Sequence, residues 1–245
     1  IAELFTKLWQ QKYGVVCNCD VTGVEKKGKN IALHTKHNGK EKIFTAENLL
    51  IATGVKPNSD NLDLSKTGIK INEKGFIAVN KFMETSAKNI HALGDIAGIY
   101  LFKHSANLEA EYVLNNLFEE KKAVDYYPMP HAIFSNPQIA GVGMTEQEAR
   151  EKNKEYLVGK YEYKNTGMGA AMEEKDGFVK FIVDRKSKEI LGCHIIGPDA
   201  STLIHEVVVA MKADRKRALD ILRETVHVHP ALSEVVQRAA RNVPV

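Results

Sequence analysis

Three segments in the C-terminal part of the chain alternate apolar and polar side chains, and this alternation limits what that part can fold into. Phe178 and Ile182 lie on the same side of the pattern, which indicates strands with a buried face. The three segments are residues 156–163, 177–184 and 189–196. A turn at 185–187 makes the last two antiparallel, and an apolar helix is expected over 203–211. One sheet covered by helices predicts a mixed α+β layer.

Two more strands and a helix precede this group. The strands are expected at 131–134 and 139–142, around Asn136-Pro137. Thr145 and Glu148 have the spacing of a capping box, in which each residue bonds the other's backbone N–H, and this predicts a helix to about Lys152. These elements extend the same layer.

His229 precedes Pro230, and Glu234 follows five positions after the histidine. Pro230 suits the first turn of a helix, because its missing N–H has no helical partner there. A helix from about Pro230 onward is predicted by the helical spacing of Leu232, Val235, Val236, Ala239, Ala240 and Val243. A carboxylate that holds one imidazole nitrogen leaves the other free to take a proton. The segment therefore suggests a general base, although a helix-entry histidine beside a solvated glutamate is the simpler alternative.

His227 also calls for an interpretation. A His-x-His pair can bind a metal, but no carboxylate or thiolate ligands lie nearby in the sequence, so we expect no metal site. Packing beside a subunit interface is the alternative. We interpret four further histidines as structural or surface residues: His104, His131, His194 and His205.

The N-terminal part begins with a predicted helix over 1–13 and a strand over 15–21. A hairpin of strands 31–35 and 41–44 is expected around Asn38-Gly39. The apolar run 48–52 is typical of a strand buried on both faces. It leads into Thr53-Gly54-Val55-Lys56-Pro57-Asn58, where Gly54 would let a ligand approach the backbone.

A second motif is Asn89-Ile90-His91-Ala92-Leu93-Gly94-Asp95. We predict a short buried strand that delivers Asp95 at its carboxyl end, where open α/β sheets bind ligands. Gly94 removes a side chain beside it. A helix is expected from Leu101 through Leu117, with free N–H groups at its start.

Composition narrows the function classes. Of 245 residues, 34 are basic and 31 acidic, a net charge of +3, which does not suggest nucleic-acid binding. No apolar run is long enough to span a bilayer, and no signal-peptide pattern is present. Cys17 and Cys19, two apart in an expected strand, and Cys193 form no disulfide framework, so we expect reduced thiols in a cytoplasmic protein.

The segments around Gly54, Asp95 and His229 occur in the order found in the pyridine nucleotide–disulfide oxidoreductases, and the chain resembles that family over almost its whole length. The family includes dihydrolipoamide dehydrogenase, glutathione reductase and mercuric reductase. The resemblance implies an α/β plus α+β fold. Residues 1–55 would be the tail of a Rossmann-like NAD-binding domain, 56–125 part of the FAD-binding domain, and 126–245 an interface domain for dimerisation.

The same resemblance assigns roles to individual residues. His229 would be the catalytic acid/base and Glu234 its partner. The residues expected to bind FAD or NAD(P) are Val21, Gly54, Gly94, Asp95, Leu101, Phe102, Lys103, His104 and Ala106. Val21 would line an adenine pocket, and the segment from Leu101 would lie against the flavin ring. Lys103 departs from the Met-Leu-Ala-His that the family often has there.

The implied function is an FAD-dependent electron transfer between NAD or NADP and a dithiol/disulfide substrate. Dihydrolipoamide dehydrogenase is the nearest match, with a homodimer and a 2-oxo acid dehydrogenase complex as its implied partners. Glutathione-like and mercuric reductases are alternatives. The family's G-x-G-x-x-G loops and cysteine pair do not occur here, so we expect a C-terminal portion of a longer flavoenzyme. A noncatalytic dimerisation module is the alternative from another class.

Overall fold

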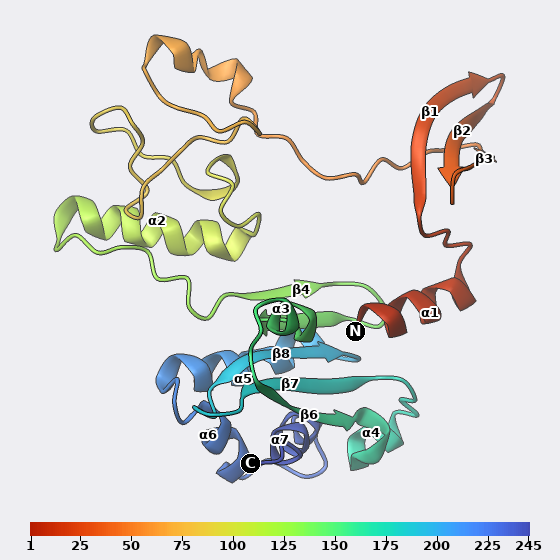
Figure 1. Ribbon diagram of the computed structural model, residues 1–245, viewed down its shortest axis with the longest axis vertical. Helices are drawn as coiled ribbons and strands as arrows, with labels where there is room; N and C mark the ends of the chain where they lie inside the picture. Colours follow the sequence, from red (N-terminus) through yellow and green to blue (C-terminus); the bar gives the residue numbers. More distant parts are fainter. The chain divides into compact units, whose positions relative to one another are not determined.

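The computed structural model describes every residue of the chain, Ile1–Val245, and divides it into two compact units. The N-terminal unit is Ala2–Lys56, and the C-terminal unit is Pro57–Val245 together with Ile1. Their helices and strands are labelled in Figure 1. No helix is long and apolar enough to cross a membrane.

The N-terminal unit consists of one helix and a three-stranded antiparallel sheet in the order β1-β2-β3. Its elements are α1 Ala2–Lys12, β1 Cys19–Lys27, β2 Asn30–His37 and β3 Lys40–Ala46. Asn38 and Gly39 have φ values of 49° and 79°, as a two-residue hairpin turn between twisted strands requires. The predicted helix and hairpin are confirmed.

Two strand predictions in this unit are wrong. The strand expected over 15–21 begins only at Cys19, because Asn18 has a left-handed φ of 52° that interrupts extended backbone. Cys17 is therefore outside the strand that holds Cys19. The run 48–52 forms no strand, and Leu50 and Ile51 are strongly exposed. A strand buried on both faces needs neighbours along its edges, and no strand of this chain pairs with the run.

Residues 57–125 form turns and irregular backbone around one long helix (Figure 1). The elements are η1 Asp60–Leu62, η2 Leu64–Lys66, η3 Gly94–Ile96 and α2 Lys103–Phe118. The predicted helix is confirmed, with its start two residues later than expected. The short strand predicted before Asp95 is absent. The segment has one isolated bridge, Glu84 with His91, and single backbone bonds such as Ala92 N–H to the Met83 carbonyl in place of a strand, and the chain turns into η3 at Gly94, whose φ is 72°.

The C-terminal sheet has five antiparallel strands in the order β4-β5-β8-β7-β6. They are β4 Pro130–Ile133, β5 Ile139–Gly143, β6 Tyr156–Glu162, β7 Phe178–Asp184 and β8 Ile190–Ile196. Each lies within one residue of its predicted bounds. The face predicted for β7 is corrected: Val179 and Phe181 are buried in the core cluster, whereas Phe178 and Ile182 share the opposite face with Lys180, which bonds Glu146.

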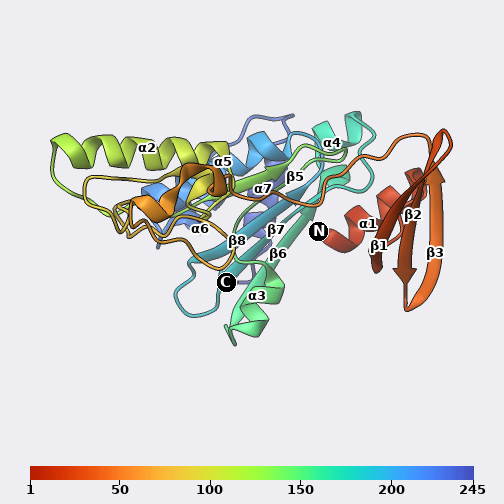
Figure 2. The same cartoon turned by 90° about the horizontal axis from the view of Figure 1, so that it is seen from above.

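Helices cover this sheet, and Figure 2 shows α5, α6 and α7 beside its strands. The elements are α3 Glu146–Glu151, η4 Tyr163–Asn165, α4 Gly167–Ala171, α5 Ala200–Ala213, α6 Ala218–Glu224 and α7 Glu234–Arg241. α5 packs on β4, β5 and β8, and α7 packs on β6 and β7, enclosing one core. The capping box of α3 is present, and α5 begins three residues before its predicted start. The sequence patterns did not predict α4 or α6.

The last helix begins at Glu234 and not at about Pro230, so that prediction is corrected. The Glu234 carboxylate accepts a bond of 3.3 Å from the backbone N–H of Ala231. Such a local side-chain bond competes with helical hydrogen bonding and favours a turn ahead of the helix. The apolar pattern still identifies the core, because Val235, Val236 and Ala239 are completely buried.

A buried histidine, His194, and a half-buried one, His131, make the stability of this sheet sensitive to mild acid. Burial lowers the pKa of His194 and of His131, although the Met144 carbonyl 2.9 Å from His194 Nε2 acts in the opposite direction. Because the unfolded chain then binds protons first, stability falls as the pH drops below about 6.5, by at most about 1.4 kcal/mol per pH unit for each group. Urea unfolding at pH 7.5 and 5.5 tests this. The His194→Gln variant should lose less stability than wild type between these pH values, and equal losses would contradict the assignment.

Candidate functional site

His229 and Glu234 form a hydrogen-bonded pair at the start of α7. The distance from His229 Nδ1 to Glu234 Oε2 is 2.9 Å. The His229 bond is the main cause that lowers the pKa of Glu234, and the Ala231 N–H adds to it. An ionised carboxylate only accepts hydrogen bonds, so Nδ1 carries the proton and Nε2 is left with a free lone pair. The predicted contact is present.

The two partners differ in their access to solvent. The His229 side chain is 71% exposed, whereas the Glu234 side chain is buried. Glu234 also stands on the first turn of α7, where the positive end of the helix stabilises a carboxylate. The pair therefore presents a basic nitrogen outward on a fixed carboxylate support. This arrangement can move a proton to and from a group that reaches Nε2.

The backbone of α4 lies close to the His229 ring. A Cβ placed on Gly167 would sit 3.2 Å from His229 Cε1, so a larger residue would press on the imidazole. Thr166 caps this helix by accepting a bond from the Gly169 N–H. The sequence patterns missed this neighbour. The signal that could have indicated it is Thr166, a typical N-cap residue, followed by glycines at 167 and 169, where a side chain would meet another part of the fold.

His227 lies two residues before His229, yet its imidazole is buried. Its Nε2 is 3.0 Å from Glu206 Oε2 on α5. The ring is packed in the interior, and its place beside a subunit interface stays a prediction. No group of three or more histidine, cysteine, aspartate or glutamate residues in the chain is arranged to hold a metal ion.

Gly94 and Asp95 lie at the start of η3, held by a carboxylate that the sequence patterns missed. The Gly94 N–H donates to Glu109 Oε2 at 2.5 Å, and the Tyr126 hydroxyl donates to Glu109 Oε1 at 2.8 Å. Glu109 is completely buried. A Cβ on Gly94 would lie 3.2 Å from that of Ala106, so η3 packs directly on α2. The Asp95 side chain is exposed and makes no side-chain hydrogen bond.

The start of α2 is close to this turn. Its N-cap residue Phe102 makes no side-chain capping bond, so the first N–H groups of a 16-residue helix remain available to an anionic or carbonyl group. Lys103 Nζ bonds Asn107 Oδ1 at 2.8 Å. His104 Nε2 bonds the Pro130 carbonyl at 2.9 Å, and its ring stacks on that of Phe102.

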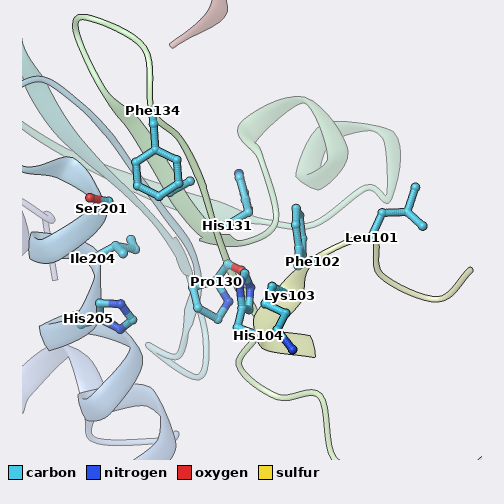
Figure 3. A pocket seen from close by; sticks show the side chains of 11 residues that line it. Leu101, Phe102, Lys103, His104, Pro130, His131, Phe134, Ser201, Ile204 and His205 are labelled. Carbon is cyan, nitrogen blue, oxygen red and sulfur yellow. The ribbon is translucent and has the colours of Figure 1, made fainter. Parts of the chain in front are cut away.

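A pocket of about 420 Å³ opens beside this helix start (Figure 3). The predicted segment Leu101–His104 forms one wall, and His131 and Phe134 form another. α5 contributes Ser201, Ile204 and His205. Three histidines interpreted as structural or surface residues, His104, His131 and His205, thus line a cavity. Their separation in the sequence hides this, because only the tertiary fold brings the three elements together.

Two residues predicted to bind the nicotinamide cofactor, Val21 and Gly54, lie in different parts of the N-terminal unit. Val21 is exposed on β1 beside a bulge between Val21 and Gly23. Gly54 lies in irregular backbone with a φ of 109°, which essentially only glycine adopts.

These features fit the groups that a flavin and a nicotinamide cofactor would present. We call the turn of Gly94 and Asp95, with Glu109 behind it, the cradle. Gly94 leaves the cradle without a side chain beside the exposed Asp95 carboxylate, which can accept a bond from a ribityl hydroxyl. The uncapped start of α2 supplies N–H donors. The backbone at Gly54 is open, because no atom lies within 4 Å of a Cβ placed there.

Comparison with known proteins identifies two family models along the chain. Residues 129–240 match the pyridine nucleotide-disulphide oxidoreductase dimerisation domain, and residues 2–112 match the model described as pyridine nucleotide-disulphide oxidoreductase. Dihydrolipoyl dehydrogenase of Geobacillus stearothermophilus is 34% identical over 226 residues, covering 92% of this chain and 48% of the relative. Mycothione reductase of Mycobacterium tuberculosis is 36% identical over 245 residues, covering 98% and 52%.

A solved structure is similar as well. The Cu(II) complex of the HOCl-induced flavoprotein disulfide reductase RclA from Escherichia coli superposes with a TM-score of 0.89 at 27% identity. The match covers 98% of this chain and 54% of that one. The chain thus spans about half the length of the curated relatives it matches.

Proposed function

This chain belongs to the pyridine nucleotide–disulphide oxidoreductase family, and on that premise we propose that the protein transfers electrons between NAD(P)(H) and a dithiol/disulfide substrate through FAD. The observation that supports this most directly is the His229–Glu234 pair. Its Nδ1 is held at 2.9 Å by a buried carboxylate, while the ring itself is largely exposed. Dithiol–disulfide exchange needs an exposed base of this kind.

The exchange needs a base because a thiol reacts as its thiolate. His229 Nε2 takes the proton of an incoming thiol, and the imidazolium that forms is stabilised by the Glu234 carboxylate on the other nitrogen. The same nitrogen returns the proton to the thiolate that leaves. Glu234 keeps a proton on Nδ1 throughout, so that Nε2 is the nitrogen that gains and loses the proton of the reacting sulfur.

The cofactor assignments follow from the cradle and the helix start. Bound FAD would supply two-electron redox chemistry between the nicotinamide and the dithiol/disulfide pair. The exposed Asp95 carboxylate would hold its ribityl chain, and the first N–H groups of α2 would face the flavin ring. Leu101, Phe102, Lys103, His104 and Ala106 would surround that ring, and Val21 and Gly54 would contact the nicotinamide cofactor. NADP remains an alternative to NAD.

The protein acts as a homodimer in this proposal. Residues 129–240 match a dimerisation domain, and Val226 and Val228 beside His229 are 92% and 74% exposed. Two exposed apolar side chains just before a catalytic base are suited to burial against a second copy. The base would then serve the partner's flavin, and the active site would be composite. A 2-oxo acid dehydrogenase complex is the proposed higher assembly.

Dihydrolipoamide is the substrate that we propose, because dihydrolipoyl dehydrogenases are frequent among the relatives at 31–34% identity. The mycothione reductase at 36% identity supports a second candidate, the reduction of a low-molecular-weight disulfide. A glutathione-like reductase belongs to this second class, and a mercuric reductase, whose substrate is a metal ion, is a separate alternative. A noncatalytic dimerisation module is the alternative if no flavin is bound.

A steady-state assay of the polypeptide as its gene encodes it tests the proposal. NADH and NADPH are each combined with lipoamide, glutathione disulfide and mycothione, after the flavin content has been measured from the visible spectrum. We expect a bound flavin and the highest kcat/KM with lipoamide and NADH. If kcat/KM is highest with another disulfide, that disulfide replaces lipoamide as the proposed substrate and the proposed reaction type is unchanged. A flavin-loaded protein that reduces none of the three would contradict the proposed function.

A further inference from the structure

The segment that carries His229 has no backbone support of its own. Residues 226–230 make no backbone–backbone hydrogen bond as donor or acceptor. Val226 and Val228 point into solvent, whereas the His227 side chain between them is only 6% exposed. His227 is therefore the inward anchor of the short segment that leads to His229.

Both ring nitrogens of His227 are engaged. Nδ1 is 3.0 Å from the carbonyl oxygen of Thr225, and a carbonyl can only accept, so Nδ1 carries a proton. Nε2 is 3.0 Å from Glu206 Oε2. A single proton shared between Nε2 and Oε2 completes this contact, either on the ring or on the carboxyl group. The ring orientation is thus fixed from two sides.

Glu206 has no other polar role that the fold explains. Its Oε1 is buried without a hydrogen-bond partner, and burial raises the pKa of this carboxyl group while His227 opposes the shift. The Glu206 side chain is 27% exposed, yet a carboxyl group with one buried and unpaired oxygen is costly. Its only hydrogen bond goes to His227, the anchor of the His229 segment. The fold therefore tolerates the unpaired oxygen of Glu206 in order to keep this one bond.

The anchor also connects to the helix that carries Glu234. The Thr225 carbonyl, which accepts from His227, accepts a second bond of 2.5 Å from Gln237 on α7. The end of α6, the His227 segment and α7 therefore meet at one oxygen, and Glu206 ties them to α5. Glu234 lies one turn from Gln237 on the same helix, so the anchor fixes the distance between the two halves of the His229–Glu234 pair.

We propose that the buried His227 ring and the half-buried Glu206 carboxyl group form a positioning device that holds His229 in register with Glu234 for proton transfer. This inference rests on the proposed function, because it assigns a purpose to a pair that touches neither substrate nor cofactor. Without the anchor, a segment that has no backbone bonds and is flanked by exposed valines lets the His229 ring turn away from its carboxylate. A displacement of about 1 Å at a reacting group can cost about 100-fold in rate.

Four variants of the full chain separate positioning from general stability. His227→Leu and Glu206→Leu remove the bond between the pair. Glu206→Gln keeps it, because its amide can donate to Nε2 of neutral His227. Glu224→Leu is the matched control, an exposed carboxylate at the end of α6. The two leucine variants should lower kcat by about 10- to 100-fold with an unchanged KM for the nicotinamide, while Glu206→Gln and Glu224→Leu stay within about threefold of wild type.

A second readout reports the position of His229 directly. In ¹⁵N spectra of the imidazoles, with the His229 signals assigned from His229→Gln, the wild type should show the Nδ1–H tautomer. His227→Leu and Glu206→Leu should shift His229 toward the Nε2–H form, and Glu206→Gln should not. Thermal unfolding checks that the variants fold. If His227→Leu does not fold, the two Glu206 variants decide.

The outcomes for this inference and for the proposed function are distinct. Wild-type kcat and an unchanged His229 tautomer in both leucine variants, beside a large loss in His229→Gln, would overturn the positioning role and leave the proposed function intact. Full turnover in His229→Gln would instead remove His229 from the proposed mechanism, and only a flavin-loaded wild type without disulfide turnover would contradict the proposed function. The tautomer alone would then decide whether the His227–Glu206 pair orients His229.

Discussion

Replacing His229 with glutamine is expected to lower dithiol–disulfide turnover by about two to four orders of magnitude, the range that loss of a general acid–base usually produces. Glutamine can still donate to the Glu234 carboxylate, so the local fold is kept. It cannot take up a proton at the position of Nε2, which is the exposed nitrogen of the pair. The loss should therefore appear in kcat and not in the unfolding temperature.

Two companion variants refine this expectation. Glu234→Gln should also lower kcat, because a neutral amide stabilises the imidazolium less than a carboxylate and can favour the wrong tautomer. His37→Gln is the matched control, since His37 lies at the end of β2 and bonds only the neighbouring Asn38 side chain. Turnover of His229→Gln within a few-fold of the His37→Gln value would remove His229 from the mechanism.

The second large effect is expected at the flavin cradle. Asp95→Ala should weaken flavin binding by about 10- to 150-fold, since a hydrogen bond to a charged group contributes about 1.5–3 kcal/mol. Glu109→Leu should also weaken flavin binding, because it leaves the Gly94 N–H and the Tyr126 hydroxyl without their shared acceptor and so loosens the turn that holds Asp95. The ratio of flavin to protein after purification, and the Kd for added FAD, measure both effects.

The control for this experiment is Asp60→Ala, an exposed aspartate in η1 outside the cradle. It should purify with the wild-type flavin content. An Asp95→Ala variant that retains flavin to the same extent would show that this carboxylate does not contact the cofactor. If Glu109→Leu loses flavin and Asp95→Ala retains it, the backbone of the Gly94–Asp95 turn holds the flavin and the Asp95 side chain does not.

The sequence patterns predicted best where structure is local. The five strands of the C-terminal sheet follow from period-two alternation and turn residues, and the capping box at Thr145 and Glu148 marks the start of α3 within one residue. The contact between His229 and Glu234 spans five residues and could be expected from the motif alone. Such features depend on residues that are close in the sequence, so they can be predicted from one sequence alone.

The failures arose where structure depends on distant partners. The run 48–52 has the composition of a central strand, yet a strand forms only where neighbouring strands pair with it, and periodicity carries no information about pairing. Gly94 was expected after a strand, but its N–H bonds the buried Glu109 and not a strand, across 15 residues. Glu206 and His227 meet across 21 residues on unconnected elements, so no local pattern could join them.

The most direct test of the central claim separates the two half-reactions of the enzyme in a stopped-flow spectrometer. Flavin reduction by NADH is compared with flavin reduction by the dithiol form of the best substrate, in wild type and His229→Gln. If His229 is the acid/base of the dithiol exchange, the variant slows the dithiol reaction by about 100-fold or more and leaves the NADH reaction within about twofold. A dithiol reaction at the wild-type rate in the variant would contradict the account.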